Sequence, residues 1–400
     1  MHKTEDLKKQ KILYISYDGI LEPLGYSQVL KYLENLSKDF EITLISFEKA
    51  GAEKLLQMQQ YCSKRNINWK PRRYHQGLSS ISHLFNIFNV LFAPFMEMFK
   101  GRHQIIHIRS YMPGLGMPLL KIFFNFKLIF DIRGFWADEK VDRLGWSKTS
   151  FKYKFFKTLE IKLFNQANTI VTLTESSKRV IQDNFYKSSD QVKVIRTCVD
   201  FSEFNTDGYI KKPYNFNRNL IIGYLGSIDT AYDFDAFLRL IKNLDARDLK
   251  IELKILSKTT PEIINDYLNK NNLSHLEYKV LFLERNKLSA TINQFDLLGF
   301  SLKPSYSLIA SMPTKIGESL ACGTPIICNN FNSDIEQIIK LNKIGALHDF
   351  SQDLNEETYQ KIISIITDDQ TSSRCHAFSL EQFSLDLGVR QYFQIYKNVL

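Results

Sequence analysis

The sequence has little that would place the chain inside a membrane or in an oxidising compartment. No apolar run reaches the roughly 18–20 residues of a membrane span, and the nearest, residues 84–99, is broken by Asn86, Asn89, Pro94 and Glu97. The amino-terminal stretch has no long apolar segment after its charged residues, so we expect no signal peptide. The five cysteines contain no Cys-x-x-Cys pair. This argues against a disulfide framework or a structural zinc site and predicts a reducing, cytoplasmic environment.

Several familiar catalytic loops are also missing. There is no Gly-x-x-x-x-Gly-Lys-Ser/Thr phosphate loop, no His-Glu-x-x-His and no Gly-x-Ser-x-Gly. Gly114 and Gly116 follow an expected strand, but Leu119 stands where a dinucleotide fingerprint needs its third glycine. Asp233 and Asp235 open an expected helix, where helix capping is a better interpretation than metal binding. We therefore expect neither a metal nor a cofactor.

Length and composition describe an ordinary globular protein with a surplus of basic residues. Four hundred residues are too many for one ordinary core and indicate two domains of about 200 residues each. Apolar residues make up 44% of the chain and charged residues 24%, a balance typical of globular proteins. The formal net charge of +9 favours an anionic partner: nucleic acid, a phosphorylated small molecule or an anionic membrane face.

Short β-branched runs alternate with segments of helical period, and this rhythm predicts an α/β fold with parallel sheets wrapped by helices. Strands are expected within residues 11–17, 41–47, 105–110, 127–134, 169–174, 192–197, 220–227, 250–257, 279–284, 295–302, 324–329 and 344–350. The rhythm restarts after the polar stretch 202–219, the best candidate for a linker. We predict two Rossmann-like, doubly wound domains, 1–208 and 209–380, facing across a ligand-binding cleft. A last amphipathic helix is expected over 385–400.

The first strand-to-helix turn could bind an anion. A strand ends near Asp18, and a helix is expected to start near Tyr26. Free backbone N–H groups and the positive end of the helix dipole attract anions, and Gly25 would let the backbone approach closely. Gly25, Tyr26 and Ser27 are therefore candidate donor-binding residues. A plain strand-to-helix turn explains this stretch equally well.

Charged and aromatic residues gather where another strand ends, in residues 130–146. Such residues at the carboxyl end of a strand suit a polar ring that carries an anion. The candidates for binding an acceptor are Arg109, Asp131, Arg133, Trp136 and Glu139. An exposed loop of ion pairs is the alternative. His107, alone at the end of its strand, is more typical of a structural histidine.

The second half repeats this pattern around residues 303–318. A strand ends at Lys303, a loop follows, and a helix is expected from about Thr314. Lys303 and Lys315 could neutralise a phosphate at the helix amino terminus, and Glu318 could accept hydrogen bonds from a ribose. The alternative is a capping box in which Thr314 is the cap. The candidate donor-binding residues of this half are Gly226, Ser227, Lys303, Ser305, Thr314, Lys315, Ile316 and Glu318.

Between about residues 11 and 335, these motifs occur in the order found in a known family. The segments YDGILEPLGYSQVLKYL, FDIRGFWADEKVDRLGW, KPSYS and MPTKIGESLACGTP resemble bacterial glycosyltransferase family 4, of the cell-surface polysaccharide type. The resemblance implies the GT-B fold, with residues 381–400 packing back on the first domain. It also implies a retaining reaction without a required metal. The second domain would hold a nucleotide-sugar donor, and the first domain would hold the acceptor.

The carry-over is incomplete at two positions. Glu318 matches the second glutamate of the family's Glu-x7-Glu motif, which holds the donor ribose, but the first glutamate falls on Ala310. The family's active-site histidine falls on Arg133, which stays protonated and cannot act as a base. Arg133 could hold a phosphate while the leaving diphosphate draws the acceptor proton. The resemblance makes Arg133, Lys315 and Glu318 the catalytic candidates, with Lys303 and Lys315 replacing the family's phosphate-binding cations.

The function implied is sugar transfer from a nucleotide diphosphate to a growing cell-surface glycan, carried on a polyprenyl diphosphate lipid, without nucleic acid as a partner. Residues 84–99 and 151–164 could contact the inner face of the plasma membrane, although buried helix faces with solvated lysines explain both segments as well. Two other functions stay open. One is a nucleotide-sugar epimerase or hydrolase of the same fold, and the other is a non-catalytic partner subunit.

Overall fold

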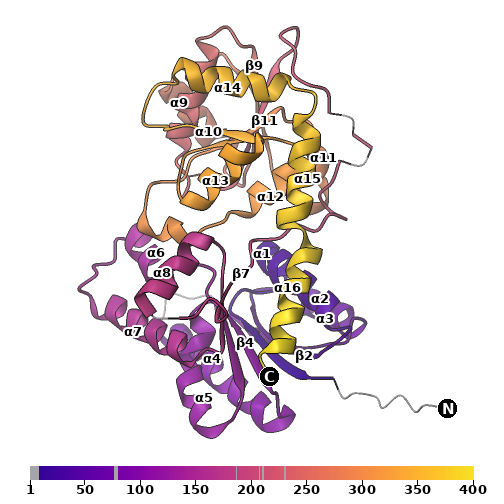
Figure 1. The fold of residues 1–400 in the computed structure, drawn as a ribbon, viewed down its shortest axis with the longest axis vertical. Helices are drawn as coiled ribbons and strands as arrows, with labels where there is room; N and C mark the ends of the chain where they lie inside the picture. Colours follow the sequence, from indigo (N-terminus) through magenta and orange to yellow (C-terminus); the bar gives the residue numbers. More distant parts are fainter. Residues whose placement is uncertain (1–8, 76–79, 186, 207, 210, 229–230) are drawn as a thin grey trace, which may run out of the picture. The chain divides into compact units, whose positions relative to one another are not determined.

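The computed structural model describes residues 9–75, 80–185, 187–206, 208–209, 211–228 and 231–400. Residues 1–8, on which part of the expectation about the amino terminus rests, lie outside this range. The chain divides into two compact units, drawn in Figure 1. Unit 1 comprises Met1–Arg196 and Leu385–Leu400, and unit 2 comprises Thr197–Ser384. The division thus differs from the predicted boundaries after residues 208 and 380.

The boundary shifts because the polar stretch that we took for a linker is anchored on unit 2. The Thr197 hydroxyl donates to the Met312 carbonyl at 2.9 Å. The Val199 N–H donates to the Phe383 carbonyl at 2.7 Å. Residue 205 is also held, because the Asn293 side chain donates to its carbonyl at 2.9 Å. The chain therefore leaves unit 1 before residue 202, where the composition changes.

Within the described residues of unit 1, seven parallel strands form one sheet in the order β3-β2-β1-β4-β5-β6-β7. These strands are β1 (Lys11–Ser16), β2 (Glu41–Glu48), β3 (Ile67–Arg73), β4 (Ile105–Arg109), β5 (Lys127–Asp131), β6 (Thr169–Thr172) and β7 (Val192–Val194). This is the doubly wound order, whose direction reverses between β1 and β4. Ligands of such sheets bind at the carboxyl ends beside the reversal.

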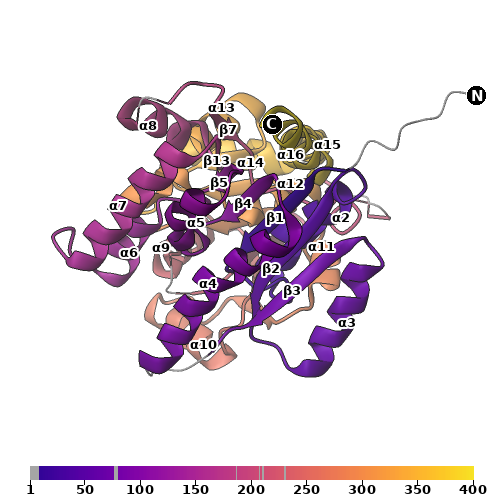
Figure 2. The ribbon, with the colours of Figure 1, turned by 90° about the horizontal axis from the view of Figure 1, so that it is seen from below.

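The helices of unit 1 cover both faces of its sheet, with α4 and α5 on one face and α2, α3 and α16 on the other (Figure 2). They are α1 (Pro23–Gly25), the π-helix η1 (Tyr26–Leu30), α2 (Lys31–Leu36), α3 (Ala52–Ser63), α4 (Ser80–Gly101), the 3-10 helix η2 (Met112–Gly116), α5 (Met117–Phe123), α6 (Trp136–Leu144), α7 (Phe151–Gln166), α8 (Glu175–Phe185) and α16 (Leu385–Asn398). The last helix, α16, packs against α2, so the predicted return of the chain to the first domain is confirmed.

Unit 2 repeats the architecture, with six parallel strands among its described residues in the order β10-β9-β8-β11-β12-β13. The strands are β8 (Leu220–Leu225), β9 (Ile251–Leu256), β10 (Glu277–Leu281), β11 (Leu297–Phe300), β12 (Ile326–Cys328) and β13 (Gly345–Leu347). The helices are α9 (Phe234–Asp245), α10 (Pro261–Lys270), α11 (Arg285–Ile292), the 3-10 helix η3 (Tyr306–Ala310), α12 (Thr314–Ala321), α13 (Ser333–Asn342), α14 (Glu356–Thr367) and α15 (Thr371–Phe383).

The α/β fold with two Rossmann-like domains is therefore confirmed, and the strands expected from the sequence are all present. The apolar runs form strands because both faces of a parallel sheet are covered, so consecutive side chains can be buried; β1, for example, buries Ile12 to Ser16. The sequence analysis missed β3. This edge strand contains Pro71 and alternates buried with exposed positions at its start, and proline is tolerated at an edge because one side of the strand needs no partner.

At the start of α9, Asp233 of the Asp-x-Asp pair caps the helix, as predicted. The Asp233 carboxylate accepts the Ala236 N–H at 2.9 Å, which satisfies a free donor of the first turn. Asp235 instead accepts hydrogen bonds from Lys270 and Asn271, at 2.8 and 2.9 Å. Both carboxylates are thus engaged by groups of unit 2.

Candidate functional site

In unit 2, two of the predicted donor residues, Gly226 and Lys315, meet where β8 ends. Lys315, the second residue of α12, donates from its ammonium group to the carbonyl of Leu225, the last residue of β8. Gly226 follows with a φ of 131°, a conformation that favours glycine. A Cβ built on Gly226 would lie 2.9 Å from the Lys315 Nζ. The glycine is therefore needed both for its backbone conformation and for the space that the ammonium group occupies.

Lys315 is a buried cation held by aromatic rings. It is 5% exposed, and its Nζ lies 3.5 Å from the centroid of the Tyr232 ring and 5.1 Å from that of Phe300. Ring faces and the Leu225 carbonyl favour the charged form. Burial acts against the charge and lowers the pKa of Lys315 to about 7, although the nearby Glu318 carboxylate opposes this shift. The charge of this group therefore changes near neutral pH.

Glu318 lies one turn further along α12 and forms an ion pair that the sequence did not reveal. Its Oε1 accepts a hydrogen bond from Arg285 Nη1 at 3.2 Å, and Arg285 Nε donates to Glu203 Oε2 at 2.7 Å. Burial raises the pKa of Glu318, while the Arg285 guanidinium opposes this shift. The capping-box alternative for Glu318 is therefore wrong, because its carboxylate pairs with Arg285 and the N-cap position is Pro313, not Thr314.

The other predicted donor residues of unit 2 differ in how far they are buried. Lys303 is exposed, and its N–H donates to the Ala231 carbonyl at 2.9 Å. Ser305 precedes η3, and Ser227 is exposed just after Gly226. Ile316 is fully buried, and its N–H already donates to the Pro313 carbonyl at 3.2 Å. Ile316 thus helps to form the core beneath the site.

In unit 1, three of the predicted acceptor residues lie together at the carboxyl ends of β4 and β5. Asp131, which ends β5, is fully buried, and its Oδ2 lies 3.7 Å from Arg109 Nη1 and 3.8 Å from Arg133 Nη1. Arg109 Nε also lies 3.6 Å from Asp18 Oδ2. These are ion-pair distances, too long for hydrogen bonds. Within the described residues, Asp131 Oδ1 and Arg109 Nε and Nη1 have no hydrogen-bond partner.

Arg133 is held in an unusual backbone conformation. Its φ is 56°, in the left-handed region that non-glycine residues rarely adopt. Its side chain is 12% exposed, whereas those of Asp131 and Arg109 are 0% and 3% exposed. A ligand that enters from solvent would therefore meet the Arg133 guanidinium before the Asp131 carboxylate. Strained residues of this kind often occur at functional sites.

His107 has the structural role that the sequence favoured. Its Nδ1 lies 2.7 Å from the hydroxyl of Tyr396, on α16. Burial lowers the pKa of His107 to about 3, so the ring is neutral at physiological pH.

Trp136 and Glu139 lie on α6 rather than in the arginine cluster. The Trp136 ring packs 4.4 Å from that of Phe156, and Lys140 Nζ lies 4.9 Å from its centroid. Glu139 pairs weakly with Arg143 at 3.9 Å, and burial raises the pKa of its carboxyl group. An acceptor role for either residue stays a prediction.

The helix after β1 begins earlier than predicted, at Pro23 and not near Tyr26. Glu22 is the N-cap residue, and the Tyr26 N–H already donates to its carbonyl at 2.8 Å. The Ser27 hydroxyl donates to the Pro23 carbonyl at 2.9 Å. Gly25 permits a close packing contact, because a Cβ there would lie 2.0 Å from the Gly19 carbonyl oxygen. The sequence misplaced this start because proline at the first helical position is a start signal in itself.

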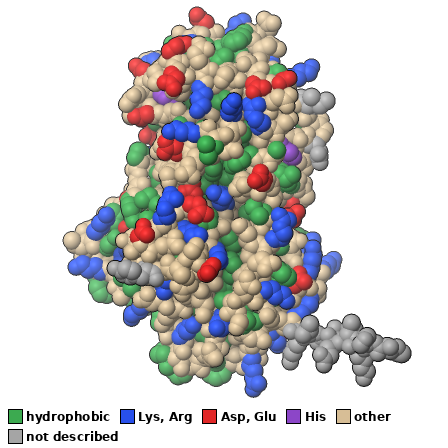
Figure 3. Space-filling model, in the orientation of Figure 1, with side chains coloured by type: hydrophobic (Ala, Val, Ile, Leu, Met, Phe, Trp, Pro, Cys, Tyr) green, Lys and Arg blue, Asp and Glu red, His purple; other side chains and the backbone are tan. Residues whose placement is uncertain are grey.

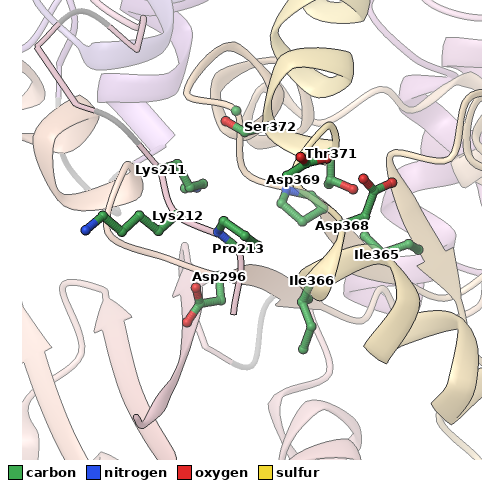
Figure 4. A pocket seen from close by; sticks show the side chains of 12 residues that line it. Lys211, Lys212, Pro213, Asp296, Ile365, Ile366, Asp368, Asp369, Thr371 and Ser372 are labelled. Atoms are coloured by element: carbon green, nitrogen blue, oxygen red, sulfur yellow. The ribbon is translucent and has the colours of Figure 1, made fainter. Parts of the chain in front are cut away.

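Two pockets in the described residues lie away from these clusters. One, of about 20 Å³, is lined by Lys211, Asp296 and Pro325 among others, shown in Figure 4. Asp296 and Pro325 directly precede β11 and β12, so this pocket is at the amino ends of the strands. The other, of about 830 Å³, lies between β7, α8 and α16 of unit 1. No predicted site residue lines either pocket.

Arg285 and Tyr232 are the residues of the unit 2 site that the sequence analysis missed. Arg285 opens α11 just after β10 ends, and Tyr232 lies in the loop after β8. Both therefore follow the carboxyl end of a strand. This position is the signal that could have identified them.

Comparisons with known proteins agree with the geometry. Residues 207–380 match the family model "Glycosyl transferases group 1", whereas no curated protein matches the sequence. Among solved structures, the chain is similar to sucrose-phosphate synthase from Thermosynechococcus elongatus, with 12% identity, a TM-score of 0.68, and coverage of 98% of this chain and 99% of that one. It is also similar to HepE from Anabaena in complex with UDP and glucose, with 13% identity, a TM-score of 0.66, and coverage of 97% and 100%.

A third similar structure is the lipopolysaccharide outer core galactosyltransferase WaaB, with 13% identity, a TM-score of 0.63, and coverage of 98% and 99%. At these identities the structures establish the fold, and the family match establishes the type of enzyme. The chain is a glycosyltransferase with the GT-B fold, and residues 207–380, within unit 2, match the group 1 glycosyl transferase model.

Proposed function

We propose that the protein is a retaining, family 4 type glycosyltransferase that builds a cell-surface glycan from a nucleotide-diphosphate sugar. The observation that carries the proposal is the arrangement at the end of β8, where a buried ammonium and a paired carboxylate lie one helical turn apart on α12. An ammonium group suits a diphosphate, and a carboxylate suits the two hydroxyls of a ribose. HepE, whose structure is similar, was solved with UDP and glucose, which supports a uridine nucleotide as the first donor to test.

The proposed mechanism uses charge rather than a protein base. Lys315 and the amino terminus of α12 hold the diphosphate, and Glu318 holds the ribose. As the bond between the anomeric carbon and the diphosphate oxygen breaks, the acceptor hydroxyl attacks from the same face. Attack from the same face retains the configuration, and the hydroxyl proton passes to the departing diphosphate oxygen. Lys315 stabilises the charge that grows on the diphosphate. The proposed transfer needs no metal. Asp233 caps α9, and Asp235 pairs with Lys270.

Unit 1 would bind the acceptor through Arg109 and Arg133. Both guanidinium groups lie at ion-pair distance from Asp131, and Arg109 keeps N–H groups without a hydrogen-bond partner among the described residues. An acceptor that carries a phosphate, such as a glycan on a polyprenyl diphosphate, would supply the missing acceptor oxygens. WaaB, another similar structure, is a lipopolysaccharide galactosyltransferase, which supports a cell-surface glycan. On the face seen in Figure 3, basic side chains are scattered among acidic ones, an arrangement that does not favour a nucleic acid there.

A peripheral membrane contact is part of the proposal, because α4 exposes many large apolar side chains and buries two polar ones. Its polar Asn86 and Glu97 are 3% and 7% exposed, and Asn86 is hydrogen-bonded to both backbone groups of His75. The exposed apolar side chains of α4 and α5, here called the α4–α5 apolar face, are Leu84, Phe85, Ile87, Phe88, Leu91, Phe92, Phe99, Leu119, Ile122 and Phe123. The rings of Phe95 and Phe123 lie 5.8 Å apart, which joins the two helices.

An apolar face of this extent marks an interaction surface. We propose that it lies on the inner face of the plasma membrane, where exposed Lys100 and Arg102 at the end of α4 would meet anionic lipids. Within the described residues, no helix is long and apolar enough to cross a bilayer. The alternative segment, 151–164, is weaker. Its Lys157 is held by Asp138 at 3.0 Å and by Glu160, so this amine does not face lipid.

The transfer itself is tested with purified protein, a panel of UDP-, GDP- and dTDP-sugars and membrane lipids from a capsule-forming bacterium, in buffer that contains EDTA throughout. We expect sugar to pass from one donor to a lipid-linked product with retained configuration. Release of free sugar without any acceptor would favour a hydrolase instead. No binding of any nucleotide diphosphate would favour a non-catalytic subunit. Activity that needs manganese would reject the metal-free mechanism.

The ribose role of Glu318 predicts a loss of nucleotide affinity. Glu318→Ala should weaken nucleoside diphosphate binding by about 1–3 kcal/mol, the scale of a lost hydrogen bond to a charged group. Arg285→Ala should act in the same direction, because the buried carboxylate loses its partner. Glu262→Ala, which removes an exposed carboxylate of α10, is the matched control. Calorimetric titration measures all three variants. An unchanged dissociation constant in Glu318→Ala would reject the ribose role.

The phosphate role of Lys315 predicts a rate effect and a pH effect. Lys315→Ala should lower kcat by about a hundredfold, the scale of one lost charge-stabilising donor. Because the pKa of Lys315 is lowered to about 7, the ammonium is charged below pH 7 and loses its proton above it. Wild-type affinity for a nucleoside diphosphate should therefore fall above pH 7, by up to about tenfold per pH unit, and this dependence should vanish in Lys315→Ala. A wild-type affinity that stays flat from pH 7 to 8.5 would contradict the assignment.

The membrane proposal predicts that two stacked rings of α4 matter more than a similar pair on α7. Phe88 and Phe92 are stacked 5.2 Å apart, and Phe151 and Phe155 are stacked 6.3 Å apart. Replacing Phe88 and Phe92 by serine should reduce binding to phosphatidylglycerol vesicles by about tenfold or more, since both rings lose their burial in lipid. The same change at Phe151 and Phe155 should leave binding intact. Sedimentation with vesicles measures this, and the reverse result would assign the contact to residues 151–164.

A further inference from the structure

The buried carboxylate of the acceptor-side cluster accepts a hydrogen bond from a residue of α16. The Tyr392 hydroxyl donates to Asp131 Oδ2 at 2.9 Å. The same oxygen is farther from the two guanidinium groups, at 3.7 Å from Arg109 and 3.8 Å from Arg133. A hydrogen bond to a buried charged group is strong, and its loss leaves that group poorly solvated. The tyrosine hydroxyl thus fixes the orientation of Asp131.

We infer that Tyr392 is a positioning residue: by holding Asp131, it keeps the Arg109 and Arg133 guanidinium groups available for an anionic acceptor group. This inference rests on the acceptor role proposed for unit 1. Without the hydroxyl, the buried carboxylate would need another donor. N–H groups of Arg109 and Arg133 lie within 4 Å of it. The carboxylate would then turn to bond one of them, and that arginine would lose donors for the ligand.

Exposure supports this division of roles. Asp131 is fully buried and Arg133 is 12% exposed, so the carboxylate acts from beneath the guanidinium and does not itself meet the ligand. Two N–H groups of Arg109 lack hydrogen-bond partners among the described residues. The cluster therefore has hydrogen-bond donors that a ligand could use. Two arginines, Asp131 and Asp18 also balance in charge, so an incoming anion meets no net negative charge.

The same helix provides a matched control one turn later. The Tyr396 hydroxyl pairs with His107 Nδ1 at 2.7 Å and not with the arginine cluster. Tyr392 and Tyr396 are both buried, and their rings lie 6.4 Å apart. Replacing either by phenylalanine removes one hydroxyl from the same helix and leaves the ring. A merely structural role of α16 would make the two variants alike.

The test measures two ligands on wild type, Tyr392→Phe and Tyr396→Phe. UDP probes the donor site, and farnesyl diphosphate, added with UDP at saturation, probes the arginine cluster. We expect Tyr392→Phe to weaken farnesyl diphosphate binding by about tenfold, the scale of a hydrogen bond to a charged group, with the UDP affinity unchanged. Tyr396→Phe should change neither affinity.

Each other outcome decides against the inference or against the function on which it rests. Equal losses in Tyr392→Phe and Tyr396→Phe, together with equally lowered Tm values, would mean that α16 acts only through packing. Wild-type affinity for farnesyl diphosphate in Tyr392→Phe, or no binding of it by the wild type, would overturn the positioning role. A wild type that binds farnesyl diphosphate but no nucleotide would instead count against the proposed donor site.

Discussion

The arrangement of unit 2 depends on a cation that is buried at the end of a strand. Moving a charged group out of water costs several kcal/mol unless other groups replace its hydration. For the Lys315 ammonium group, a backbone carbonyl and aromatic rings replace the water. Since the carbonyl belongs to the last residue of β8 and the lysine to the first turn of α12, this contact fixes the start of the helix against the strand. It also explains Gly226, whose missing side chain leaves room for the ammonium group. The contact between Lys315 and the end of β8 therefore accounts for the start of α12 and for the glycine at position 226.

Unit 1 also buries a charged group, the Asp131 carboxylate, but stabilises it with different partners. Its arginines come from the ends of β4 and β5, and they surround a carboxylate that α16 holds by Tyr392. The parallel sheet brings these side chains together, because neighbouring parallel strands end at the same edge. In unit 1, Asp18 and Arg109 follow β1 and β4, the strands beside the reversal of strand order, and Asp131 and Arg133 lie at the end of β5. In unit 2, Lys315 on α12 contacts the end of β8, beside the reversal, whereas Arg285 follows β10. The sheet thus determines where each cluster lies, and the residues that follow the strands determine which charged groups it contains.

Features set by the sheets could be predicted from the sequence, whereas contacts between residues far apart in the chain could not. The alternation of apolar runs with helical segments located the strands and the two Rossmann-like domains, because burial on both faces of a parallel sheet leaves a local pattern. Lys315 and Glu318 could be found because they share one short motif. The position of Arg285 after a strand could have marked it as a candidate, but its pairing with Glu318 could not be predicted, since the two are 33 residues apart and only the folded sheet brings them together. The same holds for Tyr392 and Asp131, which are separated by 261 residues. The polar stretch 202–219 misled for a related reason: its composition resembles a linker, but its contacts with unit 2 are long-range.

The two clusters also differ in how their charge responds to protons. Arginine side chains keep their proton throughout the physiological range, so the charge of a cluster built on arginines does not depend on pH there. His107, beside them in the sheet, is neutral because burial lowers its pKa to about 3, and it adds no titrating charge near neutrality. Lys315 is the opposite case, because burial brings its pKa to about 7. Of these groups, Lys315 alone changes charge near neutral pH. A bound diphosphate would favour the ammonium form, so donor binding would draw a proton onto Lys315, whereas anion binding at the arginines would leave their protonation unchanged.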